Sequence, residues 1–244
     1  MIRHGAMSAM ALLGLEAMYA LLRPVPHLDS HDPSGEFGDP TQPPLRVAVL
    51  GDSSVMAPGV EGPHEIWVSL VCARLATDHH VILESYAVGG SMAHDVLENQ
   101  VPPAVSFDPD LIFVSVGAND AIKGVPRHKF EANLDRLISE LSETGALIVQ
   151  SGVGALGTIP RLFPPLSNLM SIRGRRFDRV HWLVAERYGT SVVDQRSDDV
   201  KVWATDRSLW APDHFHVSAA GHARWADTVW RTVAPLVGGA LGAS

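Results

Sequence analysis

Four short segments of the chain combine glycines with side chains that can carry out acyl transfer. In chain order they are Gly51-Asp52-Ser53-Ser54, Gly89-Gly90-Ser91, Gly117-Ala118-Asn119-Asp120 and Asp213-His214-Phe215-His216. Together they supply a hydroxyl, an imidazole, carboxylates, an amide and glycine N–H groups that a substrate can approach closely. Attack on a carbonyl carbon requires a nucleophile, a base and donors to the developing oxyanion. The residue types therefore indicate nucleophilic acyl transfer, provided that the fold gathers the four segments.

Strand and helix signals alternate from residue 45 onward. Apolar segments typical of strands cover 45–50, 80–88, 110–116, 146–150 and 190–193, and helical spacing of apolar residues covers 65–77, 92–99, 127–143, 172–188 and 218–236. This alternation predicts an α/β fold, a three-layer α/β/α sandwich with a central parallel five-stranded sheet. Ligands of such folds bind beyond the carboxyl ends of the strands. The first three segments each follow a strand, and the fourth precedes the last helix, so we expect all four at one rim.

The composition is that of a globular protein whose partners are not nucleic acids. The chain has 244 residues, 46% of them hydrophobic and 19% charged, and a formal net charge of −8 without any basic run. Phosphate backbones need a cationic footprint, so nucleic-acid binding is excluded. The single cysteine, Cys72, excludes an intramolecular disulfide and a zinc site built from cysteines. His214 and His216 have chelating spacing, but no further ligand cluster completes a site, so we expect no metal and no other cofactor.

The first 44 residues are expected to lie outside the folded domain, which we predict at 45–244. Residues 1–23 contain an apolar stretch, 5–22, interrupted only by Ser8 and Glu16. A short membrane anchor, a signal-like segment, an interfacial helix and a helix docked on the domain all remain open for it. The first three place the protein at a membrane or in the cell envelope, and the last is compatible with the cytoplasm. Prolines recur through 24–44, which predicts an extended linker.

In their order, the four segments resemble those of the SGNH, or GDSL, hydrolase superfamily, over residues 45 to about 236. The resemblance implies that Ser53 is the nucleophile, that His216 is the general base and that Asp213 is the carboxylate that orients the base. The assignment is chemically coherent, because a serine hydroxyl needs an adjacent base and an imidazole with an ordinary pKa of about 6.5 suits that task. A carboxylate at the other ring nitrogen fixes the tautomer and stabilises the imidazolium.

The resemblance also implies an oxyanion hole on a flavodoxin-like version of the predicted fold. Its donors would be the backbone N–H groups of Ser53 and Gly90 and the side-chain amide of Asn119. Two positions depart from the family's pattern. Ala57 stands where a glycine often follows the nucleophile, and residues 85–87 replace an Asn-x-Gly-like start of the second segment. These changes leave the catalytic groups in place and bear on the shape of the loops and on the substrate.

The function expected from these residues is that of a serine esterase, which cleaves carboxylic esters through an acyl-Ser53 intermediate. Short or medium acyl chains are the expected substrates. Two alternatives remain open: transfer of the acyl group to a sugar or lipid acceptor by the same triad, and a non-catalytic binding module on a hydrolase fold. The second corresponds to purely structural roles for the same residues, such as a helix cap for Ser53 and a turn for Asn119.

Residues 152–157 match G-x-G-x-x-G, the pattern of a dinucleotide-binding loop, but their context does not fit. Such a loop must open a helix, and Pro160, Pro164 and Pro165 follow at once. The wider apolar stretch 155–170 is expected either to form a lip over the acyl group or near a membrane, or to cover the core. Two tryptophans close before Asp213 are candidate walls of the pocket, Trp203 and Trp210.

Overall fold

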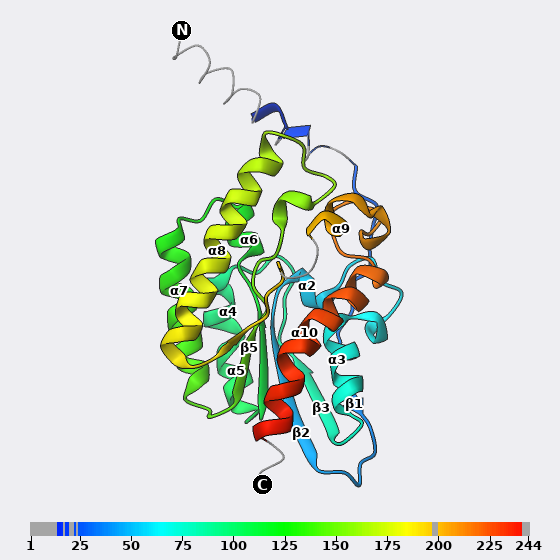
Figure 1. Ribbon diagram of the computed structural model, residues 1–244, viewed down its shortest axis with the longest axis vertical. Coiled ribbons are helices and arrows are strands. Elements are labelled where there is room, and N and C mark those ends of the chain that lie inside the picture. Colours follow the sequence, from blue (N-terminus) through cyan, green and yellow to red (C-terminus); the bar gives the residue numbers. More distant parts are fainter. Residues whose placement is uncertain (1–13, 17, 20–21, 23, 197–199, 241–244) are drawn as a thin grey trace.

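The computed structural model describes residues 14–16, 18–19, 22, 24–196 and 200–240. Their centre is a six-stranded sheet in the order β1-β3-β2-β4-β5-β6, which Figure 1 shows between two layers of helices. The strands are β1 (Gly35–Phe37), β2 (Pro44–Gly51), β3 (His80–Ser85), β4 (Leu111–Ser115), β5 (Leu147–Gln150) and β6 (Ser191–Val192). All neighbours pair in parallel except β1, which is antiparallel to β3. The predicted three-layer α/β/α architecture is confirmed.

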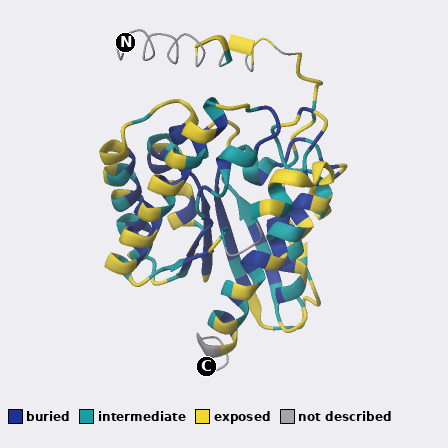
Figure 2. Cartoon of the chain, turned by 45° about the horizontal axis from the view of Figure 1, so that its top comes forward, coloured by how far each residue is buried: buried dark blue, intermediate teal, exposed yellow. Residues whose placement is uncertain are grey.

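The helices cover both faces of the sheet. They are α2 (Ser53–Met56), α3 (Trp67–Leu75), α4 (Ala93–Asn99), α5 (Val101–Ser106), α6 (Ala118–Ile122), α7 (Arg127–Ser142), α8 (Leu166–Tyr188), α9 (Val200–Thr205) and α10 (Ala219–Ala240). Alternate residues of β2 point to opposite faces, so Ala48 and Leu50 pack under α4, α5, α7 and α8, whereas Val47 and Val49 pack under α3 and α10. Figure 2 shows this buried centre beneath exposed outer helix faces.

The predicted strand number is wrong by one, because β1 was not predicted. It lies within residues 24–44, where a linker was expected, in a stretch of residues 34–39 that has no proline. Gly35 pairs with Leu83 and Phe37 with Val81, so β1 covers the free edge of β3. Three residues are too few to show strand periodicity, so the pattern carried no signal. The sheet therefore begins before residue 45.

Most of the apolar stretch 5–22, and residues 241–244 of the predicted domain, lie outside the described residues. Where the stretch is described, it contacts the start of α8. The carboxylate of Glu16 accepts the N–H groups of Phe163 at 2.6 Å and of Leu166 at 2.9 Å. The rings of Tyr19 and Phe163 lie 6.5 Å apart. No helix within the described ranges combines the length and apolar character that a membrane span needs.

Candidate active site

Ser53 opens the short helix α2 directly after strand β2 ends. Gly51, the last residue of β2, has no room for a side chain, because a Cβ atom there would lie 2.5 Å from the backbone oxygen of Ser115 in β4. Asp52 caps α2, and its Oδ1 accepts the N–H of Ser54 at 2.9 Å. This tight turn from strand to helix places Ser53 at the carboxyl edge of the sheet, where it lines a cavity.

The imidazole of His216 lies between the hydroxyl of Ser53 and the carboxylate of Asp213. Its Nε2 is 3.2 Å from Ser53 Oγ, and its Nδ1 is 2.6 Å from Asp213 Oδ2. The other carboxylate oxygen of Asp213 accepts the backbone N–H groups of Phe215 and His216, each at 2.9 Å. These two backbone bonds fold residues 213–216 into a turn, which points the carboxylate at the ring. The structure thus brings together three residues that lie up to 163 positions apart in the chain.

The charge of Asp213 is held by hydrogen bonds. Burial raises the pKa of this carboxyl, but the imidazole of His216 and two backbone N–H groups together lower it below the ordinary value. Asp213 is therefore ionised at neutral pH and accepts the Nδ1–H of the ring. That proton position leaves Nε2 with a lone pair toward Ser53 Oγ, which is the tautomer that a general base requires.

Asn119 lies beside the serine, at the start of α6. Gly117, with φ of +108°, turns the chain from β4 into this helix, and a Cβ atom there would meet the ring of Phe130 at 2.8 Å. The side-chain Nδ2 of Asn119 donates to Asp52 Oδ2 at 2.8 Å and to the carbonyl oxygen of Ser91 at 3.1 Å. Both amide hydrogens of Asn119 are therefore engaged in the free protein.

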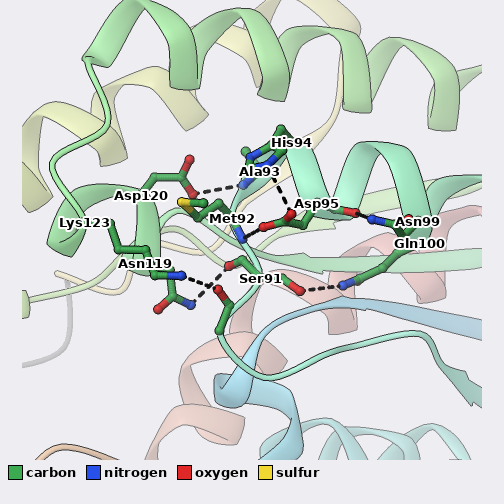
Figure 3. Close-up of polar contacts among 11 residues, drawn as sticks. Ser91, Met92, Ala93, His94, Asp95, Asn99, Gln100, Asn119, Asp120 and Lys123 are labelled. Carbon is green, nitrogen blue, oxygen red and sulfur yellow. Dashed lines mark hydrogen bonds and ion pairs between the residues drawn. The ribbon is translucent and has the colours of Figure 1, made fainter.

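Gly90 lies on the loop that Asn119 contacts, and several bonds fix that loop. It has φ of +80°, and a Cβ atom built on it would meet nothing within 4 Å. Its carbonyl oxygen accepts Nζ of Lys123 at 2.8 Å. Asp120 Oδ2 accepts the N–H of Ala93 at 3.0 Å and so ties α6 to the start of α4, as Figure 3 shows. The open space beside Gly90 leaves a substrate free to approach its backbone.

Gln100 is a buried residue of this region that the sequence analysis did not find. It lies between α4 and α5, and its Oε1 accepts the N–H of Gly51 at 2.8 Å while its Nε2 donates to the carbonyl oxygen of Gly51 at 2.9 Å. Nε2 also lies 3.3 Å from Ser91 Oγ. One amide thus joins the end of β2, before Ser53, to the loop that carries Gly90. No local pattern predicts this role, because the partners are 49 residues apart.

Asp52 holds a carboxylate in the interior of the site. Its side chain is 3% exposed, and burial raises its pKa above the ordinary value although hydrogen bonds from Ser54 and Asn119 act in the opposite direction. A buried carboxylate costs free energy unless donors surround it. Here the donors come from α2 and α6, so Oδ2 of Asp52 also orients the amide of Asn119.

The cavity in front of Ser53 has a volume of about 150 Å³. Its lining includes Asn119, Val153, Leu156, Trp203, Trp210 and Trp225. Trp203 and Trp210 are thus pocket walls, as expected. The loop 152–157 borders the cavity and leads into a single 3₁₀ turn, η2 (Leu156–Thr158), well before α8 begins, so it lacks the helix that a dinucleotide loop must open.

A half-buried ion pair between Arg196 and Asp178 fixes this loop on the side away from the cavity. Asp178 of α8 accepts the N–H of Val153 at 2.7 Å with Oδ1 and binds Nε of Arg196 at 2.6 Å with Oδ2. Arg196 in turn donates to the carbonyl oxygen of Gly154 at 2.7 Å. The cavity wall at 153–154 is therefore held by hydrogen bonds on both its N–H and C=O groups.

The pair His214 and His216 does not form a chelating face. His214 is exposed and has φ of +60°, so the residues lie on a turn and not on a strand. Within the described part of the chain, no group of three or more His, Cys, Asp or Glu side chains is placed to hold a metal ion.

Comparison with known proteins identifies the family. The model of the GDSL-like lipase/acylhydrolase family matches residues 49–224. Esterase TesA of Pseudomonas aeruginosa is 25% identical over 194 residues, which cover 78% of this chain and 89% of the esterase. An arylesterase of Vibrio mimicus is 30% identical over 109 residues, 43% of this chain and 52% of that protein.

Solved structures show the same fold. The crystal structure of TesA superposes with a TM-score of 0.66 at 24% identity, covering 79% of this chain and 99% of that chain. An acetylxylan esterase from Geobacillus stearothermophilus gives a TM-score of 0.64 at 18% identity, with 78% and 94% covered. Because the family model spans most of the folded part, this chain belongs to the GDSL-like lipase/acylhydrolase family and is an ester hydrolase.

Proposed function

We propose that the protein hydrolyses carboxylic esters of short acyl chains by a two-step reaction through an acyl-Ser53 intermediate. The observation that carries the proposal is the line of contacts from Ser53 Oγ through His216 to Asp213, at 3.2 Å and 2.6 Å. Hydrogen-bond reach between a nucleophile and its base, with a third group orienting the base, is the signature of an activated serine. This geometry favours catalysis over a non-catalytic binding role.

In the first step, Ser53 Oγ attacks the ester carbonyl carbon while its proton passes to Nε2 of His216. The carbonyl oxygen becomes an oxyanion, for which the N–H groups of Ser53 and Gly90 and the amide of Asn119 are the proposed donors. The C–O bond to the alcohol then breaks, and the imidazolium returns the proton to the departing oxygen. The products of this step are the free alcohol and acyl-Ser53.

In the second step, water attacks the acyl-Ser53 carbonyl, and His216 takes one of its protons. The tetrahedral intermediate collapses, the proton returns to Ser53 Oγ, and the carboxylic acid leaves. Asp213, ionised throughout, stabilises the imidazolium that forms in each step. The acyl group thus passes from alcohol to water, with the enzyme restored.

The cavity sets the expected acyl length. A cavity of about 150 Å³ accommodates a group of roughly the size of benzene, that is, about six carbon atoms. Its walls combine aliphatic side chains with tryptophans, which suits an acyl chain better than a charged group. We therefore expect turnover to be highest for acyl chains from acetyl to hexanoyl and to fall for longer ones.

A series of p-nitrophenyl esters from acetate to dodecanoate tests the proposal on wild type, Ser53→Ala and Ser54→Ala. Ser54 is the matched control, because its hydroxyl lies 2.8 Å from Ser115 Oγ. We expect Ser53→Ala to lose about 10³-fold or more in kcat, and Ser54→Ala to keep most activity. Fluorophosphonate should label Ser53. Equal turnover by wild type and Ser53→Ala would refute the mechanism, and a long-chain optimum would refute the acyl assignment alone.

Adding methanol or a sugar as acceptor separates hydrolysis from acyl transfer. For a hydrolase, free acid stays the main product as acceptor concentration rises. Predominant ester formation with the acceptor would identify a transferase that uses the same residues.

A further inference from the structure

Helix α8 exposes apolar side chains and arginines on one and the same face. The apolar members are Leu169, Ile172, Trp182 and Leu183, which are 39–50% exposed. Arg175, Arg176 and Arg179 are exposed between them in sequence. Spacings of three and four residues, as from 169 to 172, 176, 179 and 183, place these side chains along one stripe of a helix. We call these seven residues the outer stripe of α8.

The outer stripe is unusual for the water-facing side of a soluble domain. Most exposed helix faces are polar, whereas four large apolar side chains lie open here on a single helix. Figure 1 shows α8 as a long helix on the outside of its layer, from the rim that bears the active site toward the opposite end. The inner face of the same helix packs in the core through Met170, Phe177 and Val184.

The three arginines outnumber the one exposed carboxylate on this face of α8, Glu186. None of them makes an ion pair or side-chain hydrogen bond with any residue that the structure describes. Two carboxylates lie on α8: Asp178 is occupied by Val153 and Arg196 on the inner side, and Glu186 is exposed beside Arg179 and Trp182. Arg187, at the end of the helix, is paired with Asp135. The outer stripe is therefore a local cationic surface on a protein with a net charge of −8.

We propose that the outer stripe of α8 docks the protein on a phospholipid bilayer that carries anionic headgroups. Arginines interleaved with Trp, Leu and Ile are the pattern of helices that lie in a membrane interface. The apolar side chains enter the boundary of the acyl chains while the guanidinium groups bind phosphate. A protein partner would need matching acidic and apolar rows at helical spacing, whereas an anionic bilayer offers both features over any length of the stripe.

The amino end of the outer stripe lies close to the rim that bears the active site. Phe163, 46% exposed, precedes α8 by three residues, and Ile159 nearby lines the cavity in front of Ser53. The amino end of α8 is also where Glu16 binds the N–H groups of Phe163 and Leu166. A protein docked through α8 therefore holds the apolar side of the rim close to the lipid surface.

Cosedimentation of the full chain with large vesicles tests this proposal. Vesicles of phosphatidylcholine alone are compared with vesicles that also contain phosphatidylglycerol, at low and high salt. The test protein carries Arg175→Gln, Arg176→Gln and Arg179→Gln together, and a second carries Ile172→Ser and Trp182→Ser. The control has the same change in charge elsewhere on the surface, Lys129→Gln, Arg136→Gln and Arg231→Gln.

We expect wild type and control to bind phosphatidylglycerol vesicles in a salt-dependent manner. The triple arginine variant should bind them roughly a hundredfold more weakly, at about fivefold for each arginine near an anionic surface. The Ile172 and Trp182 variant should lose binding as well, at both salt concentrations. Every variant should hydrolyse a soluble ester as fast as wild type, which would show that each variant folds. Vesicle binding is measured separately, so its result does not depend on ester hydrolysis.

Three outcomes would overturn the proposal. Binding of wild type to neither vesicle, or to both equally, would show that the charge of the stripe recognises no lipid. An equal loss of affinity in the control and in the triple arginine variant would make net charge alone responsible. A wild-type dimer that the stripe substitutions convert to a monomer, without any vesicle binding, would assign the stripe to a second copy of the chain.

Discussion

Acid should destabilise this protein through a fully buried histidine, His181. His181 of α8 is fully buried, with its ring 3.2 Å from the carbonyl oxygen of Val116 and 2.9 Å from Gln150 Oε1. Burial lowers the pKa of His181 to about 4, despite the opposing effect of Asp178 and of the bond to Val116. The folded protein thus holds a neutral ring over a pH range in which the unfolded chain is protonated.

The sign and size of the effect follow from proton linkage. A histidine in the unfolded chain has a pKa of about 6.5, so below that pH the unfolded state binds a proton that the folded state does not. The free energy of unfolding therefore falls as the pH falls through about 6.5, and the loss levels off near pH 4. Between pH 7.5 and pH 5, one such histidine costs about 2 kcal/mol, and this cost depends little on the folded pKa provided that it is 4 or lower.

Urea unfolding, followed by tryptophan fluorescence at pH 7.5 and pH 5, gives the loss of unfolding free energy between the two pH values. The difference in that loss between wild type and a His181 variant is the contribution of His181. Wild type should lose about 2 kcal/mol more than His181→Gln between the two pH values, because all other titrating groups are common to both proteins. The control is His128→Gln, on the exposed face of α7, which should lose as much as wild type. Equal losses in wild type and His181→Gln would refute a buried neutral ring.

Two further substitutions test the machinery around Ser53. Asp213→Asn should lower kcat about 10²–10⁴-fold at pH 7 with little change in KM, because the amide no longer fixes the tautomer of His216; a loss below tenfold in steady-state assays would argue against the carboxylate's role. Asp52→Asn should lower kcat, because Oδ2 of Asp52 orients the amide of Asn119. It should also raise the urea midpoint at neutral pH: burial raises the pKa of Asp52, so above the unfolded pKa of about 3.9 the unfolded chain releases this proton more readily than the folded protein, and the carboxyl costs folded stability. A joint fall in both measurements would make Asp52 a structural residue only.

The periodic elements of the fold were predictable from the sequence because their signals are local. The helix predicted over 127–143 is observed as α7 (Arg127–Ser142), and the strand predicted over 146–150 as β5 (Leu147–Gln150). In each such segment, the buried face produces apolar residues at a regular spacing that the sequence shows directly. Strand β1 leaves none, since three residues show no period and its stability comes from pairing with an edge 44 or more residues away.

The site was predictable as a set of residue types and not as a network. Ser53 and His216 stand in short glycine- or aspartate-containing segments that can be read directly, whereas Gln100 acts only through a strand end that folding brings to it. Ala57 shows that a departure from the family's sequence pattern need not change the backbone. It departs from the family's glycine, yet the structure keeps it in the left-handed region with φ of 45°, so the backbone retains the glycine conformation with an alanine in place.

The hydrogen bonds that Asn119 makes in the free protein affect how strongly it would stabilise the transition state of the proposed reaction relative to the bound ester. In the free protein one amide hydrogen lies toward Oδ2 of the buried Asp52 at 2.8 Å and the other toward the neutral carbonyl of Ser91 at 3.1 Å. The bond to Asp52 is the shorter of the two, so an incoming oxygen displaces Ser91 and not Asp52. A neutral ester carbonyl gains little by that exchange, because it replaces one neutral acceptor with another. An oxyanion gains much more, so the exchange is favourable only as charge develops, and the bond is made in the transition state and not in the ground state.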